Sequence, residues 1–141
     1  MVEVLQPNAG VSICDWASGS GGLLLQCIRY VKKHGGDVRQ LQLHGQESNV
    51  ATYNISRINM ILHGIEAPNI VHANTLGVNI DDIQSKDQYE IVLANPPFGG
   101  KERKEVQQNF HIKTGETAFL FLQHFIKSLK PHGRAAIVIK N

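Results

Sequence analysis

The stretch Val11-Ser12-Ile13-Cys14-Asp15-Trp16-Ala17-Ser18-Gly19-Ser20-Gly21-Gly22 runs from a short apolar strand into a glycine-rich turn, and an apolar helix over residues 23–31 follows. A glycine-rich turn between a strand and a helix lets a ligand approach the backbone closely, and in an open α/β sheet it lies where ligands bind. The dinucleotide pattern G-x-G-x-x-G is incomplete, because Leu24 stands where the third glycine would be, and no P-loop lysine follows. The stretch therefore predicts an α/β fold and a ligand site at this turn, without naming the ligand.

Strand-like runs and amphipathic segments alternate along the rest of the chain, which predicts a doubly wound, mostly parallel sheet. We expect strands near residues 11–15, 40–45, 69–73, 89–94 and 134–139, and helices near residues 22–33, 48–63 and 115–130. The apolar stripes of the second and third helices are expected to lie in the core. Their members are Val50, Ile55, Ile58, Met60, Ile61 and Leu62, and Ala118, Leu122, Phe125, Ile126 and Leu129.

The tetrapeptide Asn95-Pro96-Pro97-Phe98 follows an apolar strand and has the groups needed to hold a planar aromatic amine. The prolines lack N–H groups and fix φ, so their carbonyls can face outward as acceptors. The Asn95 side-chain oxygen is a second acceptor, and Phe98 offers an aromatic face for stacking. Hydrogen bonds from both N–H groups to Asn95 and to the Pro96 carbonyl would localise the amine lone pair, with the proton leaving to solvent after attack. Taken alone, these residues could equally form a rigid turn without a ligand.

Glu47 stands at the tip of the second expected strand, just ahead of a helix that begins near Ser48. A carboxylate at this place can accept both hydroxyl hydrogens of a ribose. The alternative is an acid in the first turn of a helix, where the helix dipole stabilises negative charge.

In chain order, the glycine-rich turn, Glu47 and the NPPF tetrapeptide resemble the amino-methylating DNA methyltransferases that use S-adenosylmethionine, in particular the modification subunit of type I restriction-modification systems. The likeness covers nearly the whole chain. Members of the family carry proline where Trp16 stands, and cysteine or alanine where Ser18 stands. The matching segments are Asp15 to Gly22, Gly45-Gln46-Glu47, Leu62-His63-Gly64, Asn74-Thr75-Leu76, Asn95 to Phe98, and Thr114-Gly115-Glu116-Thr117.

This resemblance implies a Rossmann-like S-adenosylmethionine-dependent methyltransferase fold and N6-methylation of adenine in DNA, with the target nucleotide flipped out of the duplex. It implies that Asn95, Pro96, Pro97 and Phe98 hold the target base. It also implies two partners besides DNA, a specificity subunit and a restriction subunit. The cofactor-binding residues that it implies are Asp15, Glu47 at the ribose, Asn74 at the adenine, and Ala17, Ser18, Gly19, Ser20, Gly21 and Gly22 beside the methionine part. For Asn74, where many relatives carry Asp, a plain turn asparagine is the alternative.

Composition agrees with one domain, since the 141 residues are 42% hydrophobic and 18% charged. The net charge of +2 gives no strong attraction to DNA, so the DNA partner is inferred from the motifs. Cys14 and Cys27 show neither disulfide nor metal spacing, and we expect no metal site and a cytoplasmic location. The sequence has no signal-peptide pattern and no apolar run long enough for a membrane span.

Family members place a helical domain before this region and an antiparallel strand pair after it, so we expect residues 1–141 to be a single, partial methyltransferase domain, truncated at both ends. Two other functions remain open. One is methylation of an RNA base or a protein glutamine amine, where relatives commonly carry tyrosine at the position of Phe98. The other is an inert fragment that binds the cofactor or subunits. Residues 99–113 are either a solvated loop or a lid that orders over DNA.

Overall fold

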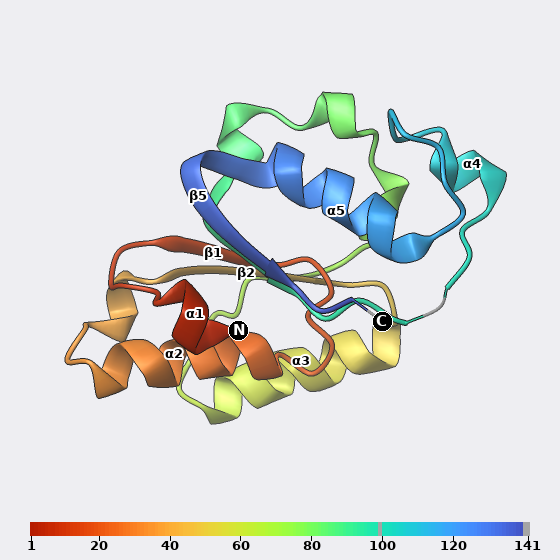
Figure 1. Ribbon diagram of the computed structural model, residues 1–141. Helices are drawn as coiled ribbons and strands as arrows, with labels where there is room; N and C mark the ends of the chain where they lie inside the picture. Colours follow the sequence, from red (N-terminus) through yellow and green to blue (C-terminus); the bar gives the residue numbers. More distant parts are fainter. Residues whose placement is uncertain (99, 140–141) are drawn as a thin grey trace.

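A five-stranded parallel sheet forms the centre of the computed structural model, which describes residues 1–98 and 100–139 (Figure 1). The strand order is β3-β2-β1-β4-β5, and every neighbouring pair is parallel. The expected doubly wound, mostly parallel α/β sheet is thereby confirmed. The strands are β1 (Ser12–Asp15), β2 (Gln42–Glu47), β3 (Ile70–His72), β4 (Tyr89–Ala94) and β5 (Leu129–Ile137).

Helices cover both faces of the sheet, with α1, α2 and α3 on one side and α5 on the other (Figure 1). Two apolar clusters fill the space between them, and β1 contributes to both because its side chains alternate between the faces. Ile13 packs into the cluster beside α2 and α3, whereas Cys14 packs into the cluster beneath α5. The helices are α1 (Val2–Leu5), α2 (Gly22–Lys33), α3 (Val50–Leu62), α4 (Lys104–Gln107) and α5 (Thr117–Ser128).

Short 3-10 turns fill the crossover from β3 to β4. They are η2 (Thr75–Gly77), η3 (Ile80–Asp82) and η4 (Ser85–Asp87), and a fourth, η1 (Val38–Gln40), precedes β2. Among the described residues, no helix is long and apolar enough to cross a membrane.

The bounds of β4 and α2 are as expected, but β5 begins earlier than the sequence indicates. The strand was expected near residues 134–139, after a helix that ends near residue 130. Instead, Leu129 pairs with Tyr89 and Arg134 pairs with Ile91, so that residues 130–133 bulge out of the ladder. The bulge lets β5 take up Pro131, which has no N–H to donate, within the strand.

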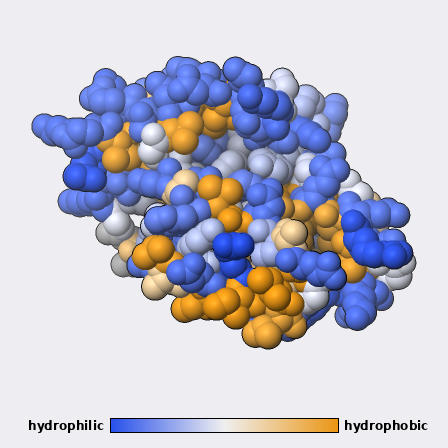
Figure 2. Space-filling view, turned by 180° about the vertical axis from the view of Figure 1, so that it is seen from behind, coloured by the Kyte–Doolittle hydropathy of each residue, from blue (hydrophilic) through white to orange (hydrophobic). Residues whose placement is uncertain are grey.

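Most of the expected apolar stripe of α3 is exposed to solvent, and Met60 is its one buried member. Ile58 is 58% exposed and Leu62 is 77% exposed, and Val50, Ile55 and Ile61 are also exposed. The buried face of α3 is narrow and consists of Ser56 and Met60. Figure 2 shows hydrophobic side chains along the lower edge of the molecule, the level at which α2 and α3 lie in Figure 1. Hydrophobic periodicity therefore predicted the burial of Met60 correctly and the burial of Val50, Ile55, Ile58, Ile61 and Leu62 wrongly.

For α5, the expected burial of the apolar stripe is confirmed for one residue and wrong for two others. Phe125 is buried, whereas Leu122 and Ile126 are exposed. The face that packs on the sheet consists of Thr117, Leu120, Phe121, His124, Phe125 and Ser128. Three of these side chains are polar, so hydrophobic periodicity could not find this face.

A buried carboxyl group ends β1. Asp15 is fully buried, and its Oδ1 accepts a hydrogen bond from the Ala17 N–H at 3.1 Å. Within residues 1–98 and 100–139 its Oδ2 has no hydrogen-bond partner. Burial raises the pKa of Asp15 from 3.8 to about 7, against the lowering effect of the Ala17 N–H, and the charge of Glu47 raises it further. At pH values below about 7, Asp15 in the folded protein is therefore mostly the protonated carboxylic acid.

Replacing this residue should change how stability depends on pH. Because the folded state raises the Asp15 pKa, the stability contribution is full below about pH 4 and is lost as pH rises through about 7. Between pH 5 and pH 8 the free energy of unfolding should fall by about 2 to 3 kcal/mol more in the wild type than in Asp15→Asn, since the amide does not ionise. Urea titrations of both proteins at both pH values measure this difference. The same pH dependence in both proteins would contradict the assigned burial.

A pair of substitutions in α3 tests which face is covered. Ile58→Gln should change the free energy of unfolding by no more than about 0.5 kcal/mol, because the side chain is exposed. Met60→Ala, two positions along the helix, should cost about 2 to 5 kcal/mol, because Met60 is buried. Thermal or urea unfolding of the two variants checks the assignment. A larger loss for Ile58→Gln than for Met60→Ala would place the opposite face against the sheet.

Candidate active site

A cavity of about 360 Å³ lies at the carboxyl ends of the strands, and we call it the strand-end cavity. Its wall includes residues that follow β1, β2, β3 and β4, because parallel strands bring their carboxyl ends to one edge of the sheet. The residues around it are Trp16, Ala17, Gly19, Gln46, Glu47, Ser48, Thr52, Ala73, Asn74, Thr75, Leu76, Asn95, Pro97, Glu102, Thr117 and Phe121.

Six of the residues singled out in the sequence line this cavity: Ala17, Gly19, Glu47, Asn74, Asn95 and Pro97. The others lie near it but not in its wall. Asp15 and Ser18 are buried behind the turn, and Gly21 is buried at the start of α2. Ser20 and Gly22 face outward. The glycine-rich turn therefore lies at the cavity, but of its predicted site residues only Ala17 and Gly19 line the wall.

Two glycines of this turn have left-handed backbone conformations, Gly19 with φ 52° and Gly21 with φ 83°. A Cβ on Gly21 would lie 3.0 Å from the Ser56 Oγ, so glycine is also needed for the close approach of α3. Hydrogen bonds from β2 and α3 hold the turn. The Ser18 N–H donates to the Gln46 carbonyl at 2.9 Å, and the Asn59 Nδ2 donates to the Ser20 carbonyl at 2.9 Å. These contacts fix the turn before a ligand arrives.

Glu47 connects the turn to the start of α3. Its Oε2 accepts from the Gly19 N–H at 3.0 Å, and its Oε1 accepts from the Asn49 N–H at 2.8 Å. Each oxygen of a carboxylate has two lone pairs, so both can accept one further hydrogen bond. Glu47 is the last residue of β2 and not an acid in the first turn of α3, so the alternative interpretation is wrong in that respect. Its carboxylate bonds one N–H of the glycine-rich turn and the N–H of Asn49, the N-cap of α3, and it lines the strand-end cavity.

A buried hydrogen-bond chain behind the cavity was not predicted from the sequence. The Thr75 Oγ1 donates to the Trp16 carbonyl at 2.7 Å and accepts from the Gln46 Nε2 at 3.0 Å. Thr75 and Gln46 are both buried. The chain ties the segments that follow β1 and β3 to β2. The sequence does contain a signal for this hydrogen-bond chain. Gln46 is next to Glu47, Thr75 is next to Asn74, and both pairs lie in segments that match the family.

Asn74 caps a turn, as its alternative interpretation predicts. Its Oδ1 accepts from the Leu76 N–H at 3.1 Å, which caps the short turn η2. The side chain is nevertheless exposed to the strand-end cavity, so its amide nitrogen stays available to a ligand.

The NPPF tetrapeptide lies between two cavities. Asn95 and Pro97 face the strand-end cavity, whereas Pro96, Pro97 and Phe98 line a second one of about 420 Å³, which we call the NPPF cavity. Phe98 is 55% exposed, and the exposed ring of Phe119 lines the same cavity. Pro97 is therefore a wall of both spaces, and exposed aromatic rings line the NPPF cavity.

The segment after the tetrapeptide contains a short helix and backbone hydrogen bonds to the start of α5. It contains α4, and its base pairs with the start of α5: the Glu102 N–H donates to the Gly115 carbonyl at 2.9 Å, and Thr117 N–H donates to the Gly100 carbonyl at 3.2 Å. Phe110 is buried. Gly99 lies outside the described residues, and the lid stays a prediction.

Known proteins are similar to this chain in sequence and in structure. The chain matches the N-6 DNA methylase family over residues 1–141. It is 38% identical to the methylase subunit of the type I restriction enzyme EcoEI from Escherichia coli, over 99% of this chain and 30% of that relative. The type I restriction-modification methyltransferase subunit from Streptococcus thermophilus superposes with a TM-score of 0.77 at 33% identity, over 93% of this chain and 30% of that one.

The fold extends to more distant enzymes. A SAM-dependent methyltransferase from Geobacter sulfurreducens superposes with a TM-score of 0.63 at 17% identity, over 96% of this chain and 44% of that one. This confirms the expected Rossmann-like methyltransferase fold. The chain spans 30% of the length of the two type I subunits above. Since the family matches along every residue of the sequence, the chain belongs to the N-6 DNA methylase family.

Proposed function

We propose that this chain is the catalytic core of a site-specific DNA methyltransferase, which transfers a methyl group from S-adenosylmethionine to adenine N6 as the modification subunit of a type I restriction-modification system. One observation carries the proposal: the strand-end cavity and the NPPF cavity meet at Pro97, beside Asn95. A methyl donor in the first cavity and an adenine in the second would lie on two sides of one tetrapeptide. Residues 1–141 would act together as one catalytic domain.

The groups around the strand-end cavity suit S-adenosylmethionine, which carries positive charge, ribose hydroxyls and an adenine amine. Glu47 and Glu102, both carboxylates, line the cavity. Carboxylates accept hydroxyl hydrogens and attract cations. When bound, this cofactor supplies the methyl group. We assign Glu47 to its ribose, Asn74 to its adenine, and the turn to its methionine part: Asp15, Ala17, Ser18, Gly19, Ser20, Gly21 and Gly22.

The tetrapeptide would hold the target base. The Asn95 Oδ1 and the Pro96 carbonyl accept the two N–H groups of the adenine amine, and Phe98 stacks on the ring. Both acceptors draw the amine lone pair out of conjugation and toward the strand-end cavity. Asn95 is exposed, so the proton that leaves after methyl transfer reaches water directly. Catalysis here is positioning and electrostatic stabilisation, without a general base.

Partners and location follow from the same proposal. The relatives are named as methylase subunits of type I restriction enzymes, which supports assembly with a specificity subunit and a restriction subunit on DNA in the cytoplasm. The chain's net charge of +2 is too small to hold DNA alone, so the specificity subunit would supply most of the DNA contact.

Methyl transfer should depend on the Asn95 amide. We expect Asn95→Ala to lower the rate of transfer from radiolabelled S-adenosylmethionine to unmethylated DNA by about 100-fold or more, since it removes one of two acceptors at the reacting amine. Cofactor affinity should stay unchanged within about twofold, because Asn95 borders the strand-end cavity but its amide is assigned to the target base and not to a cofactor contact. The assay uses each protein assembled with the specificity subunit.

Asn54→Ala is the matched control, because Asn54 is an exposed asparagine on α3 away from both cavities. It should leave the rate unchanged. Equal rates for the wild type and Asn95→Ala would refute the assigned role. Transfer to RNA or to a protein glutamine instead of DNA would support the second function, and absence of transfer to all three would support the inert fragment.

A further inference from the structure

A third cavity, of about 300 Å³, lies beneath α5, and no step of the proposed reaction uses it. We call it the histidine cavity. Trp16 and Gln46 separate it from the strand-end cavity, since both residues line both spaces. Its other walls include His44 from β2, Tyr89 from β4 and His124 from α5.

Aromatic rings form much of the wall. The Trp16 indole makes edge contacts with three rings, at centroid distances of 4.6 Å to His124, 5.6 Å to His44 and 5.8 Å to Tyr89. His44 and Tyr89 stack at 5.6 Å. The Trp16 Nε1 donates to the Ser128 Oγ at 3.0 Å, so the indole is fixed in place. The faces of such rings attract cations.

His124 is the polar group that this cavity leaves without a partner. It is 2% exposed, and neither ring nitrogen makes a hydrogen bond to any residue that the structure describes. A buried polar group without a partner costs free energy and calls for an explanation. Burial lowers the pKa of His124 to about 4, so at neutral pH the ring is uncharged, with one acceptor and one donor nitrogen.

The charged groups at the histidine cavity are all acidic. Asp82 and Asp87 line it, and no lysine or arginine does so among residues 1–98 and 100–139. Burial also lowers the pKa of His44, which keeps that ring neutral at physiological pH. Two carboxylates, neutral imidazoles and aromatic faces together favour a positively charged ligand with N–H donors.

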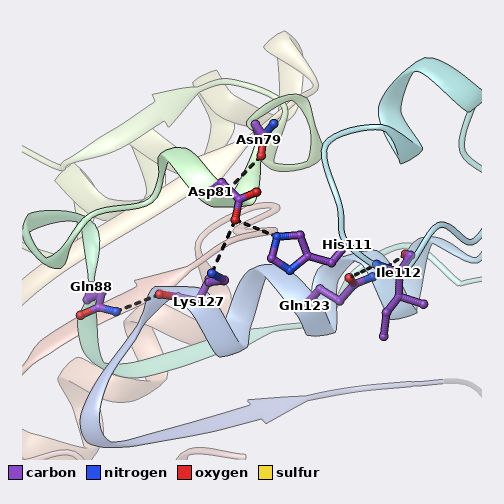
Figure 3. Close-up of polar contacts among 7 residues, drawn as sticks. All are labelled: Asn79, Asp81, Gln88, His111, Ile112, Gln123 and Lys127. Carbon is purple, nitrogen blue, oxygen red and sulfur yellow. Dashed lines mark hydrogen bonds and ion pairs between the residues drawn. The ribbon is translucent and has the colours of Figure 1, made fainter.

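The wall that carries the two carboxylates is attached firmly to α5 (Figure 3). Asp81 accepts from the His111 Nε2 at 2.7 Å and lies 3.7 Å from the Lys127 Nζ, and its own N–H donates to the Asn79 Oδ1 at 3.0 Å. The Gln88 Nε2 donates to the Lys127 carbonyl at 3.0 Å. These contacts hold both ends of the 79–88 segment, so the cavity is formed before a ligand enters.

We propose that the histidine cavity is a second ligand site, which binds a small organic cation of the guanidinium or primary-amine class against the wall formed by Trp16, Tyr89 and the His44 ring, with His124 as a hydrogen-bond partner and Asp82 as the counter-charge. The site is separate from the one that holds the methyl donor, and it does not depend on the proposed reaction.

The test uses n-butylguanidinium as the probe and n-butylurea as its neutral counterpart of nearly the same shape. Trp16 is the single tryptophan of the chain, so its fluorescence reports on this wall without a label. We expect a saturable change with n-butylguanidinium and an affinity at least about tenfold weaker for n-butylurea. Asp82→Asn should weaken n-butylguanidinium binding about fivefold, since Asp82 is exposed.

His124→Phe preserves the ring volume, removes both nitrogens and should weaken binding further. Glu105→Gln is the control, because it removes one carboxylate on α4, outside the cavity, and should leave binding unchanged. Neither Asp82 nor His124 lines the strand-end cavity, so a response that both variants reduce originates in the histidine cavity. No saturable change, equal binding of the two probes, or binding that is insensitive to Asp82→Asn would overturn the proposal and leave a water-filled cavity.

Discussion

The parallel pairing of β1 with β2 on one side and with β4 on the other is the constraint on which the rest of the structure depends. The strand order reverses direction at β1, so the chain leaves β1 and β4 at adjacent points of one sheet edge and a crevice opens between them. The glycine-rich turn and the NPPF tetrapeptide, far apart in the sequence, therefore meet in one cavity without long loops. The Gly19–Glu47 and Thr75–Trp16 hydrogen bonds then hold the segment that follows β1 against the end of β2 and the segment that follows β3.

The sequence was sufficient for the parts of the site that depend on local chemistry. A glycine-rich turn after a strand predicts a ligand site at the sheet edge, and the apolar strand before Asn95 predicts that the tetrapeptide lies at the same edge. Both segments border the strand-end cavity, so their positions could be predicted before the structure was known. The chain of Thr75, Gln46 and Trp16 could not be, because its hydrogen bonds join three segments whose proximity exists only in the folded sheet. For the same reason the sequence could not show that Ser18 and Gly21, which belong to the motif, are buried and do not line the cavity.

Errors about burial have a related cause. The apolar residues of α3 repeat at helical spacing, yet the sheet packs on the side that carries Ser56 and Met60. Close approach to Gly21 requires small or flexible side chains on that side, and this requirement is not visible in a hydrophobic pattern. In α5 the buried face includes Thr117, His124 and Ser128. Asp15 is a further example, because a hydrophobic pattern does not predict that a carboxyl group is fully buried at the end of β1.

The central claim is that the strand-end cavity binds S-adenosylmethionine through Glu47, and calorimetric titration of the cofactor into the wild type and Glu47→Gln tests it most directly. The account predicts saturable binding with one site in the wild type and an affinity lower by about tenfold or more in Glu47→Gln, because the variant loses charge-assisted hydrogen bonds both to the ribose and to the Gly19 N–H. Glu66→Gln, an exposed carboxylate outside this cavity, should bind as the wild type does. Absence of binding to the wild type, or equal affinity for the wild type and Glu47→Gln, would contradict the account.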